Sequence, residues 1–243
     1  MNQQLLSMLG GLFASGGSAG GAIQNRTVSI GSEKYDYQLY APNDVQNKAD
    51  LPVIVFLHGI RERGSGGYVP TEGAFGKIIN HYFAQVPAIV LLPQCRPGKY
   101  WSDPAMNEMV LQSLNKTVEE FEADTKRIYL IGVSMGGYGV WHFATNYPGK
   151  FAALVSICGG SSITSGDRFS PVAEKVGKTP AWVFHGANDN IVPVSESRQI
   201  VAALKANGEN VKYSEYPGVG HNVWLNVLSE KELLSWLLKQ HLE

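Results

Sequence analysis

The sequence contains little cysteine and no long apolar run. Two cysteines among 243 residues, Cys95 and Cys158, exclude a framework of several disulfides, and neither shows the Cys/His spacing of a zinc site. No stretch approaches the roughly 20 consecutive apolar residues that span a bilayer. We therefore expect no structural metal and no transmembrane segment, and the redox compartment stays open.

An excess of charge of one sign is also missing. Lys and Arg number 20 against 21 Asp and Glu, so the formal net charge is −1. A chain with this balance has no broad field to attract nucleic acid or an anionic membrane. The expected partner is an uncharged or weakly charged small molecule rather than a nucleic acid.

The first 24 residues differ in composition from the rest. Apolar side chains stand at helical spacing within residues 5–13, and a Gly/Ser-rich tract follows at 16–21. A signal peptide would need a positively charged start, yet only Arg26 precedes Lys34. The apolar face suits docking on the domain, on a second subunit or on a lipid interface. We predict an N-terminal arm over 1–24 that docks on its own domain, with a homodimer through the arm as the second reading. Localisation stays open between cytoplasm and secretion, and cytoplasm is the preferred expectation.

Apolar runs bounded by turn residues recur through residues 25–243, and the central ones are continuous rather than alternating. Strands buried on both faces of a parallel sheet show this pattern. Helix-like stretches separate the runs, so the chain predicts an α/β fold with a mostly parallel sheet and helices on both faces. The expected strands are 27–30, 37–40, 53–57, 89–92, 128–133, 152–157, 181–184 and 211–216. The expected helices are 76–83, 107–123, 136–147, 195–207 and 225–241. One domain without a cap domain is expected over 25–243, because the segment 159–179 is short and polar.

One serine stands in an apolar, glycine-rich stretch. Gly132-Val-Ser134-Met-Gly136 has the pattern Gly-x-Ser-x-Gly and lies between an expected strand and an expected helix. A serine on a sharp strand-to-helix turn projects its hydroxyl above the sheet edge, and the flanking glycines let other backbone pass close by. The start of the helix directs free N–H groups and a positive dipole end to the same point. The pattern predicts Ser134 as a nucleophile, with an ordinary Gly/Ser turn as the alternative.

A serine hydroxyl needs a base to take its proton and a carboxylate to orient that base. Asp189 lies in the loop after the seventh expected strand, and His221 lies in a glycine-flanked loop after the eighth. We predict Asp189 as the acid and His221 as the base, although a lone loop aspartate is usually a solvated turn or a helix cap. His58 and His185 each close a strand, where local hydrogen bonding is expected.

Acyl transfer also needs N–H donors for the oxyanion of the tetrahedral intermediate, each worth roughly 3–4 kcal/mol. The backbone N–H of Met135, directly after Ser134, is the first expected donor. The second is the N–H of Ile60, because Gly59 lets the chain turn at the end of the apolar run 53–57.

These residues resemble the α/β-hydrolase superfamily, in its branch of lidless carboxylesterases similar to feruloyl esterases, acyl-protein thioesterases and depolymerases. The chain order Ser, Asp, His is the order expected there. The resemblance covers about residues 25–243 and departs from the His-Gly-Gly-Gly motif of hormone-sensitive-lipase-like esterases, which argues against esters of tertiary alcohols. It rests on four stretches: Leu57-His58-Gly59, Gly132 to Gly137, His185-Gly186-x-x-Asp189-x-x-Val192-Pro193 and Gly220-His221.

In such enzymes the loop after the fourth strand lines the substrate pocket, so the resemblance implies this role for residues 94–103. Tyr100 and Trp101 are the expected aromatic wall, and Trp224, three residues past His221, is a further candidate. A flat aromatic wall suits an aryl or short acyl group, and simple packing is the alternative for each ring.

The usual strand order of the superfamily places two strands between the fourth and the sixth. That separation is about 14 Å, which is too long for a disulfide between Cys95 and Cys158. Both cysteines are therefore expected to be free thiols.

Together these features predict a serine carboxylesterase that hydrolyses short-chain or aryl esters through an acyl-enzyme, with no metal and no cofactor. The enzymatic alternative is a peptidase similar to the catalytic domain of prolyl oligopeptidases, which share the same residue order. The alternative from another class is a hydrolase-fold binding module in which the three residues are unused.

Overall fold

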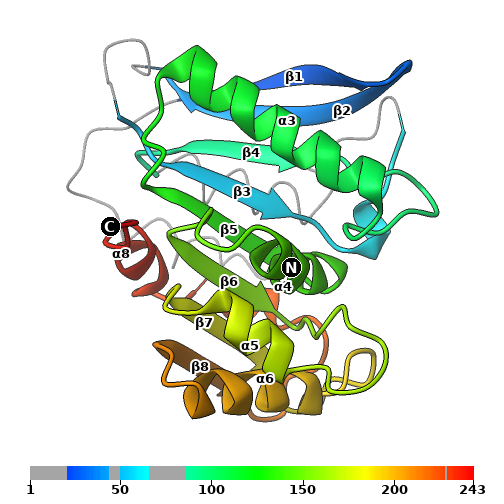
Figure 1. The fold of residues 1–243 in the computed structure, drawn as a ribbon, viewed down its shortest axis with the longest axis vertical. Helices are drawn as coiled ribbons and strands as arrows, with labels where there is room; N and C mark the ends of the chain where they lie inside the picture. The colour runs from blue at the N-terminus through cyan, green and yellow to red at the C-terminus, as the bar shows by residue number, and fades with distance from the viewer. Residues whose placement is uncertain (1–20, 44–49, 66–85, 228) are drawn as a thin grey trace, which may run out of the picture.

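An eight-stranded sheet organises the described part of the chain (Figure 1). The computed structural model describes residues 21–43, 50–65, 86–227 and 229–243. The strands are β1 (Gly21–Ile30), β2 (Glu33–Pro42), β3 (Val53–Leu57), β4 (Ile89–Pro93), β5 (Ile128–Val133), β6 (Ala153–Ile157), β7 (Ala181–Gly186) and β8 (Val211–Tyr216). The helices are η2 (Ile60–Glu62), α3 (Pro104–Phe121), α4 (Met135–Asn146), α5 (Ser170–Val176), α6 (Ser195–Ala206), α7 (Trp224–Val227) and α8 (Leu233–Leu237). In these ranges no helix has the length and hydropathy needed to cross a bilayer.

The sheet is mostly parallel, as the continuous apolar runs predict. Its strand order is β1-β2-β4-β3-β5-β6-β7-β8. β2 pairs antiparallel with both β1 and β4, and all pairs from β4 to β8 are parallel. Every residue of the central strands β3, β5 and β6 is buried, because helices cover both faces. The fold class expected from the sequence is confirmed.

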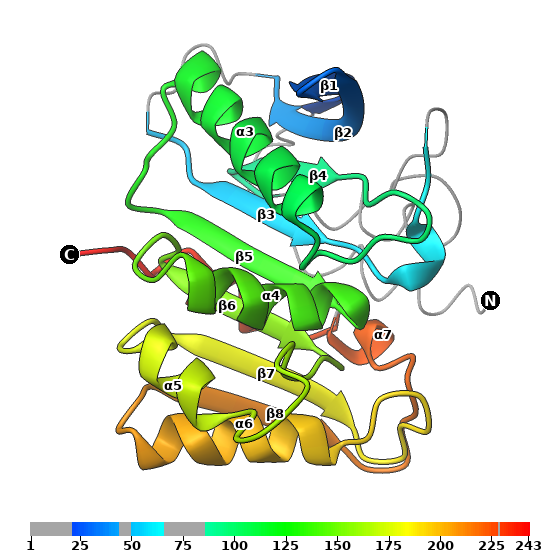
Figure 2. The ribbon, with the colours of Figure 1, turned by 45° about the vertical axis from the view of Figure 1, so that its right-hand side comes forward.

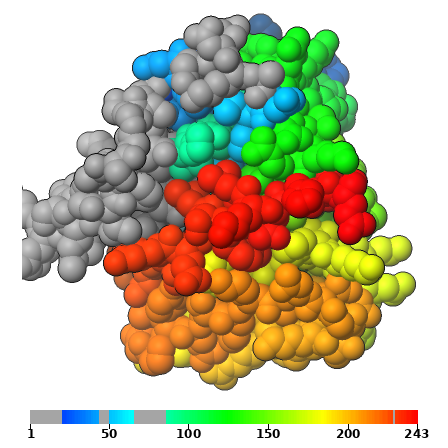
Figure 3. All heavy atoms as spheres, turned by 90° about the vertical axis from the view of Figure 1, so that its left-hand side faces the viewer, coloured from blue at the N-terminus to red at the C-terminus, as the bar shows by residue number. Residues whose placement is uncertain are grey.

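Two apolar cores lie on the two faces of the sheet. Alternate residues of each strand face opposite sides, so Val55 belongs to the core under α3, α4, α5 and α6, while Ile54 belongs to the core under α7 and α8. Figure 2 shows α3 to α6 lined up along one face of the sheet. The C-terminal residues lie across one side of the molecule, between the green and the orange segments (Figure 3). There Tyr129 Oη donates to the carbonyl oxygen of Gln240 at 2.9 Å.

The N-terminal part of the sheet extends further than the sequence indicates. β1 begins at Gly21 rather than at residue 27, so its first residues fall within the segment 1–24 that was expected to form an arm. Backbone pairing with β2 over the full ten residues of β1 holds this extension, which hydropathy alone does not show. Residues 1–20 and the expected helix 76–83 lie outside the described residues, and the homodimer through the arm stays a prediction.

The expected helix over 225–241 is wrong, because the chain forms two short helices, α7 and α8. Val223, Val227, Leu233 and Leu237 are buried in the same core. Successive helical residues turn by about 100°. Four-residue steps keep a side chain on one face, but the six-residue step from Val227 to Leu233 turns it by roughly 240°. One continuous helix would expose part of this set, so the chain breaks between the two.

Helix α5 was missed because the segment 159–179 reads as polar. A proline at the start of a helix and buried residues one turn apart are its signals. Pro171 lies in the first turn of α5, and Val172 and Val176 are buried. The two cysteines behave as expected: β3 and β5 separate β4 from β6, and Cys95 and Cys158 are both free and buried.

Gly136 packs against the backbone at the end of β3. A Cβ atom there would lie 1.9 Å from the carbonyl oxygen of Leu57, and that oxygen cannot move without disturbing β3. We expect Gly136→Ala to lower the unfolding midpoint by roughly 5–10 °C, in line with an overpacking cost of about 3 kcal/mol. Thermal unfolding followed by circular dichroism measures this. Gly220→Ala is the control, because its Cβ would meet nothing nearer than 3.8 Å; equal midpoints for the two variants would contradict the packing argument.

Candidate active site

Ser134 occupies a sharp turn between β5 and α4. Its backbone angles are φ 55° and ψ −115°, and a positive φ is uncommon for a serine. The turn is held by backbone hydrogen bonds from Ser134 N to Ile157 O at 2.8 Å and from Tyr138 N to Ser134 O at 3.1 Å. A Cβ on Gly132 would lie 2.1 Å from the carbonyl oxygen of Gly136, so only glycine fits there. The strained turn keeps the hydroxyl at the end of the strand.

Ser134, His221 and Asp189 form a hydrogen-bonded line. The distance from His221 Nε2 to Ser134 Oγ is 2.9 Å, and that from His221 Nδ1 to Asp189 Oδ2 is 2.7 Å. A carboxylate only accepts, so Nδ1 carries the proton and Nε2 accepts from the serine hydroxyl. The structure thus brings together the three residues that the sequence selects from three distant loops.

The carboxyl group of Asp189 is held at both oxygens. Oδ1 accepts from the backbone N–H groups of Ile191 and Val192, each at 2.9 Å. Burial by itself would raise the pKa of Asp189, but the hydrogen bonds from His221, Val192 and Ile191 outweigh it and hold the pKa below its usual value. The group stays ionised and keeps its charge beside the imidazole.

His185 also reaches Asp189, which the sequence does not reveal. Its Nε2 lies 3.0 Å from Val192 O and 3.3 Å from Asp189 Oδ2, and its Nδ1 lies 2.7 Å from Ser197 Oγ. Both neighbours of Nε2 are acceptors, so Nε2 carries the proton and the Ser197 hydroxyl donates to Nδ1. Burial lowers the pKa of His185 and keeps it neutral. His185 therefore makes the local hydrogen bonds that were expected for it, and its Nε2 also points to the carboxylate of Asp189.

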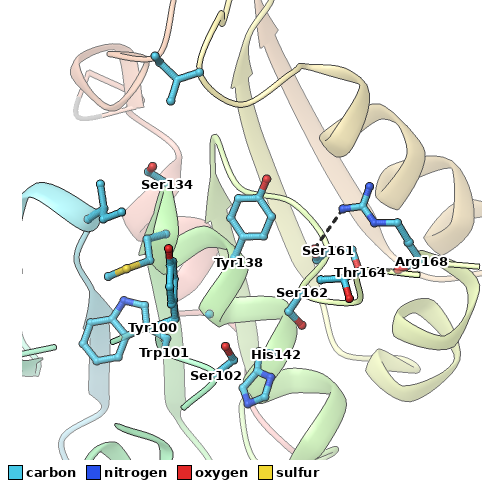
Figure 4. Close-up of a pocket in the computed structure, with 14 residues that line it drawn as sticks. Tyr100, Trp101, Ser102, Ser134, Tyr138, His142, Ser161, Ser162, Thr164 and Arg168 are labelled. Atoms are coloured by element: carbon cyan, nitrogen blue, oxygen red, sulfur yellow. Dashed lines mark hydrogen bonds between the residues drawn. The ribbon is translucent and has the colours of Figure 1, made fainter. Parts of the chain in front are cut away.

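A cavity of about 470 Å³ opens beside Ser134 (Figure 4). Tyr100 and Trp101 line it, as the resemblance implies. Trp101 is buried, and its Nε1 donates to His58 O at 3.0 Å. Trp224 is not among the lining residues; its ring packs edge-on against His221 with centroids 6.0 Å apart. The other lining residues are Ile60, Ser102, Met135, Tyr138, Gly139, His142, Ser161, Ser162, Thr164, Arg168 and Ile191.

The two expected oxyanion donors lie at helix starts beside the cavity. Met135 is the first residue of α4 and Ile60 is the first residue of η2. The first N–H groups of a helix have no partner within the helix and are free for an anion. Both residues line the cavity next to Ser134.

One wall of the cavity comes from the segment after β6 and was missed in the sequence. Arg168 pairs with Glu196 of α6 through two contacts of 2.7 and 2.9 Å, and Glu196 also accepts from Ser161 N at 3.2 Å. This pair compensates the charge of Arg168 on the cavity wall. A bidentate pair between residues 28 positions apart leaves no local sequence signal.

Ser134, Asp189, His221 and most residues that line the cavity belong to a segment that matches a known protein family. A family model described as phospholipase/carboxylesterase matches residues 101–233, more than half of the chain. The chain belongs to the phospholipase/carboxylesterase family. This confirms the α/β-hydrolase superfamily and its carboxylesterase branch, which the motifs indicate.

Several proteins similar to this chain carry esterase names, and others carry peptidase names, such as dipeptidyl aminopeptidase BIII of Pseudoxanthomonas mexicana, which is 24% identical over 221 residues, 74% of this chain and 32% of the peptidase. A thermostable esterase of known structure has a TM-score of 0.79 and 32% identity, covering 90% of this chain and 63% of that chain. Acyl-protein thioesterase 1 of Gibberella zeae is 26% identical over 215 residues, which are 77% of this chain and 89% of the thioesterase. The bifunctional acetylxylan esterase/xylanase XynS20E of Neocallimastix patriciarum is 24% identical over 163 residues. That match covers 65% of this chain and 22% of the bifunctional enzyme.

Among the described residues of this phospholipase/carboxylesterase-family chain, one group has the geometry to hold a metal ion. Ligand atoms of Cys158, Asp189 and His221 lie within 4.8 Å of one another. The carboxylate and imidazole atoms are already joined to each other and to Ser134. Burial raises the pKa of Cys158, which keeps the thiol protonated and makes it a poor metal ligand. The donor set fits hydrogen bonding better than metal binding.

The lowered pKa of Asp189 predicts a pH-dependent contribution to stability. An unfolded aspartate has a pKa of about 3.9. A lowered folded pKa stabilises the protein above that value and stops doing so as the pH falls through the folded pKa. We therefore expect Asp189→Asn to unfold at lower urea concentration than the wild type at pH 7, and the difference to shrink between pH 4 and pH 3. Urea midpoints measured from pH 7 to pH 3 test this, and a difference that is constant over the range would contradict it.

Proposed function

We propose that this protein is a serine carboxylesterase that hydrolyses its substrate through an acyl-enzyme on Ser134. The observation that carries the proposal is the line from Ser134 to His221 to Asp189, with contacts of 2.9 and 2.7 Å, at the edge of a cavity. Membership of the phospholipase/carboxylesterase family supports ester chemistry. In this proposal residues 25–243 form the catalytic domain.

The first half of the reaction transfers the acyl group to Ser134. Ser134 Oγ attacks the ester carbonyl carbon while its proton passes to His221 Nε2. The tetrahedral intermediate then collapses, the carbon–oxygen bond to the alcohol breaks, and His221 returns the proton to the leaving alcohol. Asp189 holds the imidazole in place and stabilises its positive charge. The N–H groups of Ile60 and Met135 stabilise the oxyanion.

The second half releases the acid. A water molecule gives a proton to His221 Nε2 and attacks the acyl carbon, and the bond from that carbon to Ser134 Oγ breaks. The proton on His221 returns to Ser134, which restores the starting state. No step of this cycle requires a metal or a cofactor.

The lining of the cavity supports short-chain or aryl acyl groups as substrates. Tyr100, Trp101 and Tyr138 supply aromatic surface, and Ile60 and Ile191 supply apolar surface at its edge. Arg168 is paired with Glu196, so a negatively charged substrate gains no free cation there. An uncharged ester fits these walls.

Removing the Ser134 hydroxyl tests the nucleophile. We expect Ser134→Ala to lower kcat/KM for p-nitrophenyl butyrate by at least roughly 10³-fold and to abolish labelling by a fluorophosphonate, because the acyl-enzyme cannot form. Ser162→Ala is the matched control, since Ser162 lines the same cavity away from the strand-to-helix turn. Labelling that persists in Ser134→Ala would remove this residue as the nucleophile.

Comparing esters with amides separates the esterase from the peptidase alternative. An ester alkoxide leaves more easily than an amine, and an esterase lacks the contacts that a peptidase makes to a peptide chain. We expect p-nitrophenyl acetate and butyrate to be hydrolysed, and the matching acyl and prolyl anilides to react at least about 100-fold more slowly in kcat/KM. Anilide turnover equal to ester turnover would favour the peptidase.

A further inference from the structure

The cavity follows one face of α4. Met135, Tyr138, Gly139 and His142 all line it, and steps of three and four residues place side chains on the same side of a helix. Seven residues at 1.5 Å each separate Met135 from His142 by about 10 Å along the helix. Figure 4 shows Ser134 at one end of the cavity and Ser102 and His142 at the other. The cavity therefore extends along α4 from the nucleophile to His142.

The position of His221 decides which half of an ester occupies this space. Ser134 lines the cavity, whereas His221 and Asp189 are not among its lining residues. The leaving alcohol must lie beside His221, because it receives its proton from Nε2. The acyl group is the other substituent of the carbonyl carbon, so it extends into the cavity along α4.

His142 and Ser102 separate the cavity from a second hollow. That hollow lies between α3 and α4, has a volume of about 500 Å³ and is more open. Ser102 and His142 line both spaces and so form the partition between them. The remaining lining residues of the hollow are Pro104, Asn107, Glu108, Leu111, Gln112, Asn146 and Tyr147.

The imidazole of His142 is fixed in this partition. Asn107 donates from Nδ2 to Trp101 O at 2.6 Å and to Asp103 O at 3.1 Å, which orients its amide. Asn107 Oδ1 is then an acceptor, and it lies 3.0 Å from His142 Nε2, which must donate. The ring also packs edge-on against Phe143 with centroids 5.8 Å apart. The partition is held in one position.

We propose that His142 closes the far end of the acyl cavity and sets the longest acyl chain that the enzyme accepts. This inference rests on the proposed esterase function and adds its acyl specificity. An extended alkyl chain, with C–C bonds of about 1.5 Å, needs roughly eight bonds to cover the length from Met135 to His142. Acyl groups of up to about eight carbons fit, and longer ones meet the imidazole.

The experiment compares p-nitrophenyl esters of acetate, butyrate, octanoate and dodecanoate for four proteins. In the wild type we expect kcat/KM to rise to butyrate or octanoate and to fall for dodecanoate. His142→Ala joins the cavity to the hollow, and each newly buried methylene contributes up to about fourfold. The dodecanoate-to-butyrate ratio should therefore rise at least tenfold over the wild type.

Two variants control this comparison. His142→Gln keeps a side chain of similar length with an amide that can donate to Asn107, so its dodecanoate-to-butyrate ratio should stay within about threefold of the wild type. Gln112→Ala changes a residue of α3 that lines the hollow but not the cavity, and its ratio should also stay unchanged. If His142→Ala does not fold, His142→Ser removes the ring in the same way and should show the same rise.

Several results would overturn the inference. They are an unchanged ratio in a folded alanine or serine variant of His142, an equal rise in Gln112→Ala, or a wild type that prefers dodecanoate. Failure of the proposed function looks different: the wild type would hydrolyse none of the four esters and would not be labelled at Ser134, and the acyl specificity would fall with it.

Discussion

The buried carboxylate of Asp189 is the interaction on which the site depends. Its side chain is 0% exposed, and an ionised carboxylate out of water is stable only when its oxygens are hydrogen-bonded. Two backbone N–H groups, those of Ile191 and Val192, satisfy Oδ1, while His221 satisfies Oδ2 and His185 lies close to it. The loop after β7 is therefore shaped around one charge, and that charge fixes the orientation and tautomer of His221.

The first turn of α6 serves both the carboxylate and the cavity. Ser197 donates to Nδ1 of His185, whose Nε2 donates toward Asp189 and the carbonyl oxygen of Val192. Its neighbour Glu196 holds Arg168 and the backbone of Ser161 on the cavity wall. Adjacent residues of a helix point in different directions, so one turn can hold two separate parts of the site. A shift of α6 would move the acid and the wall together.

The sequence predicts the bounds of an element best where a single physical cause determines them. The runs 53–57, 128–133 and 211–216 match the strands residue for residue, because burial or sheet pairing alone sets their length. The structure also brings together Ser134, Asp189 and His221, since loops at one sheet edge meet whatever their distance in the chain. Prediction fails where the structure depends on a contact between two separate elements. The break between α7 and α8 depends on the core that both helices share, and the cavity wall at Arg168 depends on Glu196 in a distant helix.

The position of Ser134 links catalysis to the shape of the cavity. It is the residue before α4, and the first two turns of that helix form one side of the cavity. In the proposed mechanism the N–H groups at the start of α4 face the reacting carbonyl. A residue further along α4 therefore lies further from Ser134 Oγ. Met135, Tyr138 and His142 line the cavity at increasing distance from Ser134 along α4. In the proposed binding mode, a change at any one of them alters the space for the acyl group at that distance. In this proposal one helix sets both the place where the ester bond is attacked and the length of acyl chain that fits beside it.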